Sequence, residues 1–226
     1  MKTEIIYEDK DILVCRKPAG LAVENAAVGR MDMVSELKNY LKSPYLGVVH
    51  RLDQPVEGLL VFAKNPKSAA SLSKQLKNNI LSKEYFAVVC GKPVPDAGRF
   101  VDYMTKDSKT RMARVVKKGD ADGKEAILTY STLQNIDNPD ISLLKIQIET
   151  GRFHQIRAQL ANAGIPIVGD RKYGNEASSK IYAATGTKNV ALCACSLNFK
   201  HPATNEGLSF KIIPDYGVFG MFKFDK

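Results

Sequence analysis

The sequence predicts an α+β fold, with a mostly antiparallel or mixed central sheet and flanking helices. Short apolar runs typical of strands recur along most of the 226-residue chain, and several follow one another across a short turn. Only about three segments carry apolar residues at helical spacing, and strands and helices do not alternate regularly. Hydrophobic residues make up 44% of the chain, enough for a core, and we find no repeat or low-complexity linker. We therefore expect a single domain over residues 1–226.

The first elements are expected to be a strand pair, a helix, a strand and a second helix. "EIIYED" and "DILVCRKPAG" are apolar runs separated by an acidic turn, and Pro18 and Gly20 end the second run. "MDMVSELKNYLK" has helical spacing, whereas "LLVFAKN" is typical of a strand. Asn65 and Pro66 form a helix start, with an N-cap followed by proline, so the next helix should continue through "KSAASLSKQLKNN".

The rest of the chain predicts mainly strands. "KEYFAVVCG" is a strand ended by Gly91, and residues 92–125 indicate strands joined by exposed turns. "ILTYSTLQ" and "ISLLKIQIET" follow as strands, and "GRFHQIRAQLANAG" is expected to be helical, with Gly164 as its C-cap. Two final strands are predicted in "NVALCACSLNFKHP" and "LSFKII".

Composition narrows the class of partner. Lysine and arginine exceed aspartate and glutamate by nine (33 − 24), which favours a polyanionic partner, with nucleic acid ahead of a membrane. No apolar run reaches the roughly 18 residues of a spanning helix, and the N-terminus lacks signal-peptide features. We expect a cytoplasmic protein. Its cysteines include a C-x-C pair and not C-x-x-C, and its three histidines are widely separated, so no metal site is predicted.

The stretch "GVVHRLDQPVEGLLVFAKN" places charged residues between apolar runs. Asp53 and Glu57 could form the carboxylate pair of a glycosidase, but Pro55 and Gly58 make a shared helix face doubtful. We interpret Glu57 as a solvated turn residue. Asp53 should sit where a strand opens into a loop, and the local pattern fits a catalytic group and a turn-capping residue equally well.

A second charged cluster lies in "ETGRFHQIRAQL". Arg152 and His154 are expected in the first turn of a helix and Arg157 near its middle. Cations do not complement a helix N-terminus, so an anionic group should lie nearby. Arg157 could reach a buried aspartate as a forked partner, with Asp53 the natural candidate, or could instead be an exposed helix residue.

Two further features fit nucleic-acid binding. Tyr85, on the strand "SKEYFAVVCG", could stack on a base or could be an ordinary sheet tyrosine. The stretch "KDSKTRMARVVKK" could follow a phosphate backbone or could be a solvated loop. Its cations are Lys106, Lys109, Arg111, Arg114, Lys117 and Lys118.

Together, these segments resemble the RluA-type family of RNA pseudouridine synthases. The matching segments are "HRLD" at 50–53 followed by Gly-Leu-Leu, "SKEYFAVVCG", "TRMARVV…GKEAILTY", "TGRFHQIR", "GIPIVGDRKYG" and the opening "IIYEDKDILVCRKPAGL". The resemblance covers nearly the whole chain. It implies the pseudouridine synthase catalytic fold and the isomerisation of uridine to pseudouridine in ribosomal or transfer RNA, without metal or organic cofactor, by a monomer.

The resemblance also implies roles for individual residues. Asp53 corresponds to the essential catalytic aspartate, which attacks base or sugar or removes a sugar proton. Tyr85 corresponds to the active-site tyrosine and Arg157 to the arginine that pairs with the aspartate, which would keep Asp53 ionised. Arg51, next to His50, corresponds to the arginine that enters RNA where the target nucleotide has left its stack. RNA contacts are further expected from Lys109, Arg111, Arg114, Lys117, Lys118, Arg152 and His154.

The sequence departs from the family pattern at two places. Val56 and Glu57 stand where the family usually has Thr-Ser, and the chain is expected to lack the S4-like domain of many relatives, so that RNA selection would come from the catalytic domain. Two other functions remain open from the residues. One is a nucleoside or sugar hydrolase using Asp53 and Glu57, and the other is an RNA-binding protein of this fold without activity.

Overall fold

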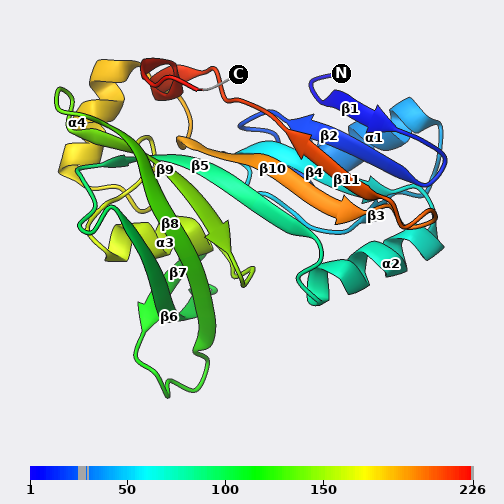
Figure 1. The fold of residues 1–226 in the computed structure, drawn as a ribbon, viewed down its shortest axis with the longest axis horizontal. Coiled ribbons are helices and arrows are strands. Elements are labelled where there is room, and N and C mark those ends of the chain that lie inside the picture. The colour runs from blue at the N-terminus through cyan, green and yellow to red at the C-terminus, as the bar shows by residue number, and fades with distance from the viewer. Residues whose placement is uncertain (25–28, 30, 225–226) are drawn as a thin grey trace. The chain divides into compact units, whose positions relative to one another are not determined.

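The computed structural model describes residues 1–24, 29 and 31–224 (Figure 1). The chain forms two compact units, each built from two segments of sequence. Unit 1 comprises Met1–Lys83 and Ala194–Ile212, and unit 2 comprises Glu84–Cys193 and Ile213–Lys226. The expectation of one domain over residues 1–226 stays a prediction.

Unit 1 is a small sheet with two helices. β1 pairs with β2, β2 and β3 each pair with β4, and β10 pairs with β11, all antiparallel, while β10 also adjoins β4. Its strands are β1 (Glu4–Glu8), β2 (Ile12–Lys17), β3 (Gly47–Val48), β4 (Glu57–Ala63), the greater part of β10 (Leu192–Lys200) and β11 (Gly207–Lys211).

The two helices of unit 1 begin at side-chain caps. Asp32 accepts a hydrogen bond from the Ser35 amide at the start of α1 (Met33–Leu41), and Asn65 caps α2 (Pro66–Lys77) as the sequence predicts. Helix α2 packs against β3 and β4, which it borders in Figure 1. The core of this unit is apolar and buried, with residues Ile12, Val14, Leu59, Val61, Ala63, Leu72, Leu81, Leu197 and Phe199.

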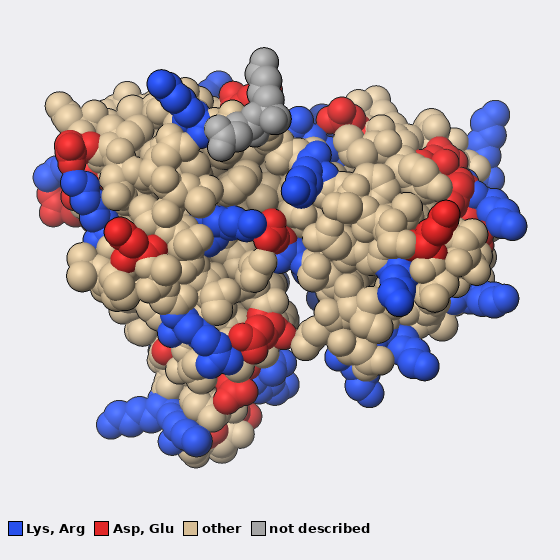
Figure 2. Space-filling model, viewed as in Figure 1, with Lys and Arg blue, Asp and Glu red and all other residues tan. Residues whose placement is uncertain are grey.

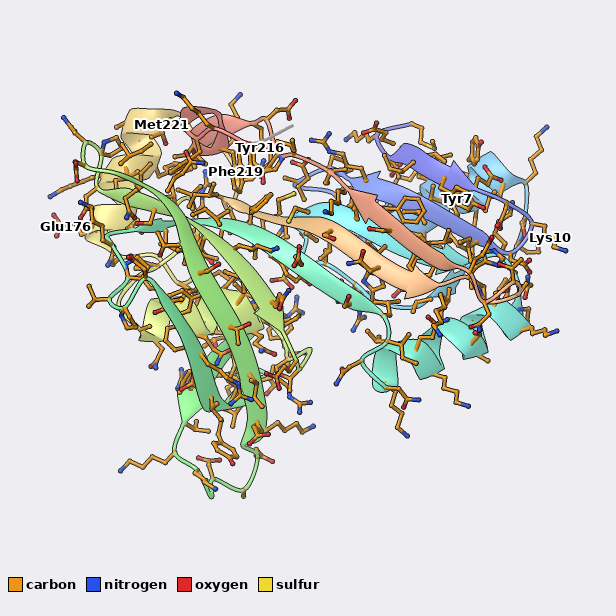
Figure 3. The ribbon with its side chains drawn as sticks, in the orientation of Figure 1. Tyr7, Lys10, Glu176, Tyr216, Phe219 and Met221 are labelled. Atoms are coloured by element: carbon orange, nitrogen blue, oxygen red, sulfur yellow. The ribbon has the colours of Figure 1, made fainter. Side chains whose placement is uncertain are left out.

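Unit 2 is an antiparallel sheet in the order β5-β9-β8-β6-β7. Its strands are β5 (Ser82–Cys90, which begins in unit 1), β6 (Ala97–Asp107), β7 (Met112–Val116), β8 (Lys124–Ile136) and β9 (Ile141–Ile148). Helix α3 (Gln155–Asn162) packs against β6 and β7, and Ala158 joins a small core with side chains of β6, β7 and β8. Helix α4 (Glu176–Thr185) and the short 3₁₀ helix η1 (Gly217–Met221) complete the unit; the rings of Tyr216 and Phe219 contact edge to face at η1 (Figure 3).

The predicted α+β class is confirmed, and the strand pairs with a described register are antiparallel. One helix was not predicted: α4 begins at an Asn175–Ser178 capping box and ends before Gly186. The predicted start of the third helix was wrong, because α3 begins at Gln155, after Arg152 and His154. Among the described residues, no helix is long and apolar enough to cross a membrane.

Candidate active site and RNA-binding surface

Asp53 lies in a tight turn that leads into β4. Its carbonyl accepts a hydrogen bond from the Val56 amide (3.0 Å), and its side chain is half-buried between the buried Leu52 and Val56. The sequence predicts Asp53 where a strand opens into a loop, but β3 ends at Val48, and Asp53 lies in the turn that precedes β4. The turn gives the carboxylate a defined backbone with partial access to solvent.

A buried lysine binds the backbone of this turn. Lys17, at the end of β2, is fully buried, and its ammonium donates to the carbonyl oxygens of Gln54 (3.0 Å), Leu21 (2.7 Å) and Pro18 (3.0 Å). Gln54 is also joined to Gly20 through both main chain and side chain. Burial lowers the pKa of Lys17 to about 7, although the nearby Asp53 and Glu57 carboxylates act in the opposite direction.

Glu57 is not the solvated turn residue that the sequence predicts. It is the first residue of β4 and is buried, and its Oε1 accepts from Nε (2.6 Å) and Nη2 (2.5 Å) of Arg16 on β2. Strand register places Arg16 opposite Leu59, so both ion-pair partners lie where β2 and β4 meet. The expectation failed because a buried carboxylate can be stabilised by a guanidinium 41 residues away, which local pattern does not reveal.

Gly58 is required by the close approach of β10. Its φ is 143°, and a Cβ there would lie 2.5 Å from the Ala194 backbone nitrogen. Any larger residue would push β4 away from β10 directly after Glu57.

His50 and Arg51 are oriented differently. His50 is buried, and its Nε2 accepts from the Val61 amide at 3.3 Å, so the ring supports the backbone of β4. Burial lowers the pKa of His50 well below its ordinary value, with a further contribution from the Lys83 charge. Arg51 is 68% exposed and lies 3.9 Å from the Glu24 carboxylate. Direct contact of His50 with RNA stays a prediction.

Arg157 is buried and forms a forked ion pair. Its Nε donates to Oδ2 of Asp170 (2.7 Å) and its Nη2 to Oδ1 (2.8 Å), and Oδ1 also accepts from the amides of Lys172 and Tyr173. The alternative of an exposed helix arginine is therefore wrong, and the expected fork onto a buried aspartate is present with Asp170. Arg157 and Asp53 belong to different units, so their pairing stays a prediction.

Tyr85 is buried within β5, opposite Ile146 of β9. Its exposed fraction is 4%, so little of the ring reaches solvent. This placement is consistent with a ring that lines an enclosed site and equally with a core residue, so its predicted role stays a prediction.

The segment before α3 carries an exposed aromatic ring. Phe153 precedes the helix and is 38% exposed. Its ring stacks on that of His154 (centroids 3.8 Å apart) and lies 4.7 Å from Nζ of Lys106. Arg152 is exposed, and its Nε donates to the Glu125 carbonyl. His154 has a left-handed backbone (φ 51°), which is uncommon for a non-glycine residue and is typical of functional or tightly constrained positions.

Tyr173 connects this segment with the hairpin β6–β7. Its hydroxyl lies 2.8 Å from Nδ1 of His154 and accepts from the Ala113 amide of β7 (2.7 Å). The guanidinium of Arg157 lies over the Tyr173 ring at 5.1 Å. Asp170, Arg157, Tyr173 and His154 therefore form one continuous polar and aromatic cluster in unit 2.

The hairpin β6–β7 and the loop after it carry most of the predicted RNA-binding cations. All of them are exposed: Lys106, Lys109, Arg111, Arg114, Lys117 and Lys118. Arg114 pairs with Asp107 at 3.2 Å, and Asp107 also accepts from two amides of the hairpin turn. Figure 2 shows blue side chains projecting from the tip of the β6–β8 region, among several acidic ones.

One group of side chains in the described residues has metal-ligand character: Asp9, Asp11 and His201 offer ligand atoms within 4.8 Å of one another. Nδ1 of His201 accepts from the amides of Ala203 and Thr204, so Nε2 carries the proton and donates to Oδ2 of Asp9 (2.8 Å). Because both ring nitrogens are engaged, this cluster is built as a hydrogen-bonded link between two loops.

Sequence reasoning missed Lys17, Asp170 and Tyr173 as contributors to these sites. Asp170 and Tyr173 lie in the quoted segment "GIPIVGDRKYG", whose regular G-D-x-x-Y-G spacing was the available signal. Gly169 has φ 79°, and a Cβ there would lie 2.3 Å from the Asn189 carbonyl oxygen, which shows how closely this turn is packed. No comparable signal marked Lys17, because a lysine at a strand end is ordinarily solvated.

Comparison with known proteins gives one consistent family. The family described as RNA pseudouridylate synthase matches residues 11–162. An uncharacterised RNA pseudouridine synthase of Bacillus subtilis is 35% identical over 219 residues, which cover 93% of this chain and 69% of the relative. A ribosomal large subunit pseudouridine synthase C of Rickettsia prowazekii is 37% identical over 174 residues, covering 76% of this chain and 56% of the relative.

A solved structure has the same fold. Human RNA pseudouridylate synthase domain containing 1 superposes with a TM-score of 0.77 at 21% identity, covering 94% of this chain and 84% of the human chain. The matched portion is thus about two thirds of the Bacillus relative and little more than half of the Rickettsia one.

Proposed function

Because the chain belongs to the RNA pseudouridylate synthase family, we propose that it isomerises particular uridines of ribosomal RNA to pseudouridine, with Asp53 as the catalytic group. The chain is an isomerase that makes pseudouridine in RNA. The observation that carries the assignment to Asp53 is its position in the H-R-L-D turn, half-buried and held by hydrogen bonds to the adjoining backbone.

Ribosomal RNA is the preferred substrate for two reasons. Relatives from Rickettsia prowazekii and Neisseria meningitidis are named as synthases of the large ribosomal subunit. The net charge of +9 also suits a large polyanion. Transfer RNA is the competing substrate and is included in the test below. The same proposal places the protein in the cytoplasm, as a monomer.

The reaction needs a fixed carboxylate more than a strong acid. The bond between uracil N1 and ribose C1′ breaks, C5 becomes bonded to C1′, the C5 proton is lost to solvent and N1 gains a proton. Asp53 takes part by adding to base or sugar, or by removing a ribose proton. A carboxylate on a rigid turn keeps its position relative to the uridine, and such positioning contributes strongly to rate.

Tyr85 and Arg157 complete the proposed catalytic set. Tyr85 would stack on the detached uracil and assist proton transfer, and its burial suits a site closed to bulk water. Arg157 would hold the Asp53 carboxylate in its ionised form, as the family resemblance implies, while Asp170 keeps the guanidinium plane oriented.

Arg51 is proposed to fill the gap left by the target nucleotide. A uridine in a stem or loop must leave its stack to be reached, and a flat guanidinium can both stack and donate hydrogen bonds in its place. The high exposure of Arg51 and its long distance from Glu24 leave the side chain able to do so. His50 contributes indirectly, through its hydrogen bond to the Val61 amide.

RNA affinity is assigned mainly to unit 2. The exposed cations of the β6–β7 region would contact phosphates, and Arg152 and His154 lie in the adjoining segment before α3. Because phosphate contacts carry little sequence information, these residues would set affinity and orientation, while the choice of uridine depends on contacts close to the turn.

The test is release of tritium from RNA labelled at C5 of uridine. The substrates are ribosomal RNA fragments and transfer RNA, each with the wild-type protein and with Asp53→Asn. We expect release from ribosomal RNA with the wild type and none with Asp53→Asn, whose RNA affinity should change little. Mapping pseudouridines in ribosomal RNA before and after treatment identifies the position.

Other outcomes would replace the proposal. Release of tritium from transfer RNA alone would show that transfer RNA, and not ribosomal RNA, is the substrate. Free uracil in place of pseudouridine would indicate a hydrolase, although the Glu57 carboxylate that such an enzyme would need is bound to Arg16. RNA binding without release from any fraction would indicate a binding protein of this fold.

A further inference from the structure

The turn that carries Asp53 is held from two directions within unit 1. On one side, Gln54 binds Lys17 and Gly20. On the other, Glu57, the first residue after the turn, binds Arg16, the neighbour of Lys17 on β2. Within the turn itself, the Val56 amide donates to the Asp53 carbonyl.

The Arg16–Glu57 pair is unlike an ordinary surface ion pair. The Glu57 side chain is 7% exposed and that of Arg16 is 25% exposed, and both contacts are short. The Arg16 contact with Glu4 is much longer, at 3.9 Å. A pair this shielded is little screened by salt, and removal of either charge breaks both short contacts.

The pair also occupies a restricted place in the strand register. Lys17 is opposite Gly58 and Arg16 is opposite Leu59, so the two cations of β2 lie beside the first residues of β4. Gly58 cannot move outward from Ala194 without breaking the contact between β4 and β10. Glu57 is therefore fixed on one side by the sheet and on the other by Arg16.

We propose that Glu57 is a positioning residue for the isomerisation, and that it acts by pairing with Arg16 to fix the turn that presents Asp53. Glu57 does not touch the uridine in this scheme. Its carboxylate holds the end of the turn against β2, while Lys17 holds the middle. Loss of the pair lets the turn sample more conformations, so that fewer bound complexes place Asp53 correctly. The inference rests on the proposed catalytic role of Asp53.

The main experiment measures tritium release by Glu57→Gln and Arg16→Met at temperatures where both are folded. Gln keeps the shape of Glu57 and removes its charge. We expect kcat to fall at least about 10-fold with KM for RNA changed less than about 2-fold, because the loss concerns positioning and not RNA binding. The double variant should be no worse than either single variant, since both remove the same interaction. Arg16→Lys, which keeps the charge, should recover much of kcat.

A matched control separates positioning from general destabilisation. Phe199→Leu removes packing from the core of unit 1 without touching the pair. Phe199→Leu should lower the melting temperature about as much as Glu57→Gln does, but it should leave kcat near that of the wild type. Equal kcat losses in Phe199→Leu and Glu57→Gln would overturn the proposal, as would multiplicative losses in the double variant.

A second readout does not depend on the activity. Amide hydrogen exchange at Val56 and Gly20 reports opening of the turn and of its neighbouring loop. Both amides should exchange faster in Glu57→Gln and Arg16→Met than in the wild type or in Phe199→Leu. Unchanged exchange overturns the inference even if the wild type proves active, whereas faster exchange in a protein that releases no tritium from any RNA refutes the proposed function alone.

Discussion

The Asp53 turn of unit 1 and the β6–β7 region of unit 2 use charge in opposite ways. Around the Asp53 turn of unit 1, Lys17 and Glu57 are buried and bound to fixed partners at short distances. In the β6–β7 region of unit 2, the cations are exposed, and Arg114 is held by Asp107. Burying a charge is costly unless it is fully paired, so buried charges mark positions that must not move. Exposed cations keep their mobility and suit a long, variable polyanion.

Unit 2 also contains a buried pair, which makes the contrast one of location and not of unit. Arg157 and Asp170 are as well enclosed as Glu57, and their fork is complete. The same segment then continues through Tyr173 to the exposed Phe153 and the basic hairpin. In this segment the buried Arg157 and the exposed Phe153 are therefore only a few residues apart in the sequence.

The largest effect is expected from breaking the buried fork. Asp170→Asn keeps an oxygen for the amides of Lys172 and Tyr173 but removes the buried negative charge of the fork with Arg157. The free energy of unfolding should fall by about 3–5 kcal/mol, as for other buried pairs that lose one partner. Urea denaturation measures it. Glu149→Gln is the control, because its pair with Arg99 is exposed, and it should cost less than about 1 kcal/mol. Equal losses would show that burial does not distinguish the two pairs.

A smaller effect is expected on RNA binding when exposed cations are removed. Replacing Arg111, Lys117 and Lys118 by Gln should weaken binding about 10-fold and reduce the slope of log affinity against log salt by about 2, if each charge meets one phosphate of single-stranded RNA. Filter binding at several salt concentrations measures both. The control replaces three exposed lysines of α2, namely Lys67, Lys74 and Lys77. An equal loss with the α2 control would remove the assignment of RNA binding to the hairpin.

The smallest effect concerns pH and Lys17. Its pKa is about 7 in the folded protein and close to 10.5 when unfolded, so the unfolded chain binds more protons between these values. The free energy of unfolding should therefore rise with pH from 7 to 8, by about 1 kcal/mol from this group. Denaturation of the wild type and of Lys17→Met at both pH values measures the difference. A rise of the same size in Lys17→Met would mean that another group titrates.

Local patterns predicted most of the fold, and long-range pairing explains the failures. Alternating apolar runs and the Asn65 cap gave the strands and helix α2 because those signals act within a few residues. Glu57 was misassigned because its partner Arg16 is distant in sequence, and the start of α3 was misplaced because His154 adopts a left-handed backbone.

The candidate site was only partly predictable from local residues. Local pattern predicted a loop at Asp53 but placed it at the end of the preceding strand, whereas the structure has it before β4. The roles of Asp53, Tyr85 and Arg157 came from the family resemblance. The fork of Arg157 onto an aspartate was expected, but Asp170 was not identified as the acceptor, because the G-D-x-x-Y-G spacing marks the segment without showing which side chain it meets. A buried ammonium such as Lys17 is visible only once the three carbonyls around it are placed.

The hydroxyl of Tyr173 joins the basic hairpin to the segment before α3. It accepts from the Ala113 amide and lies 2.8 Å from Nδ1 of His154. A strand of the hairpin and the imidazole therefore share one hydroxyl as a hydrogen-bonding partner. A movement of β7 that separates Ala113 from Tyr173 would leave the phenol free to turn and would change its contact with the imidazole. Movement of the hairpin is in this way coupled to the setting of one imidazole ring at the start of α3.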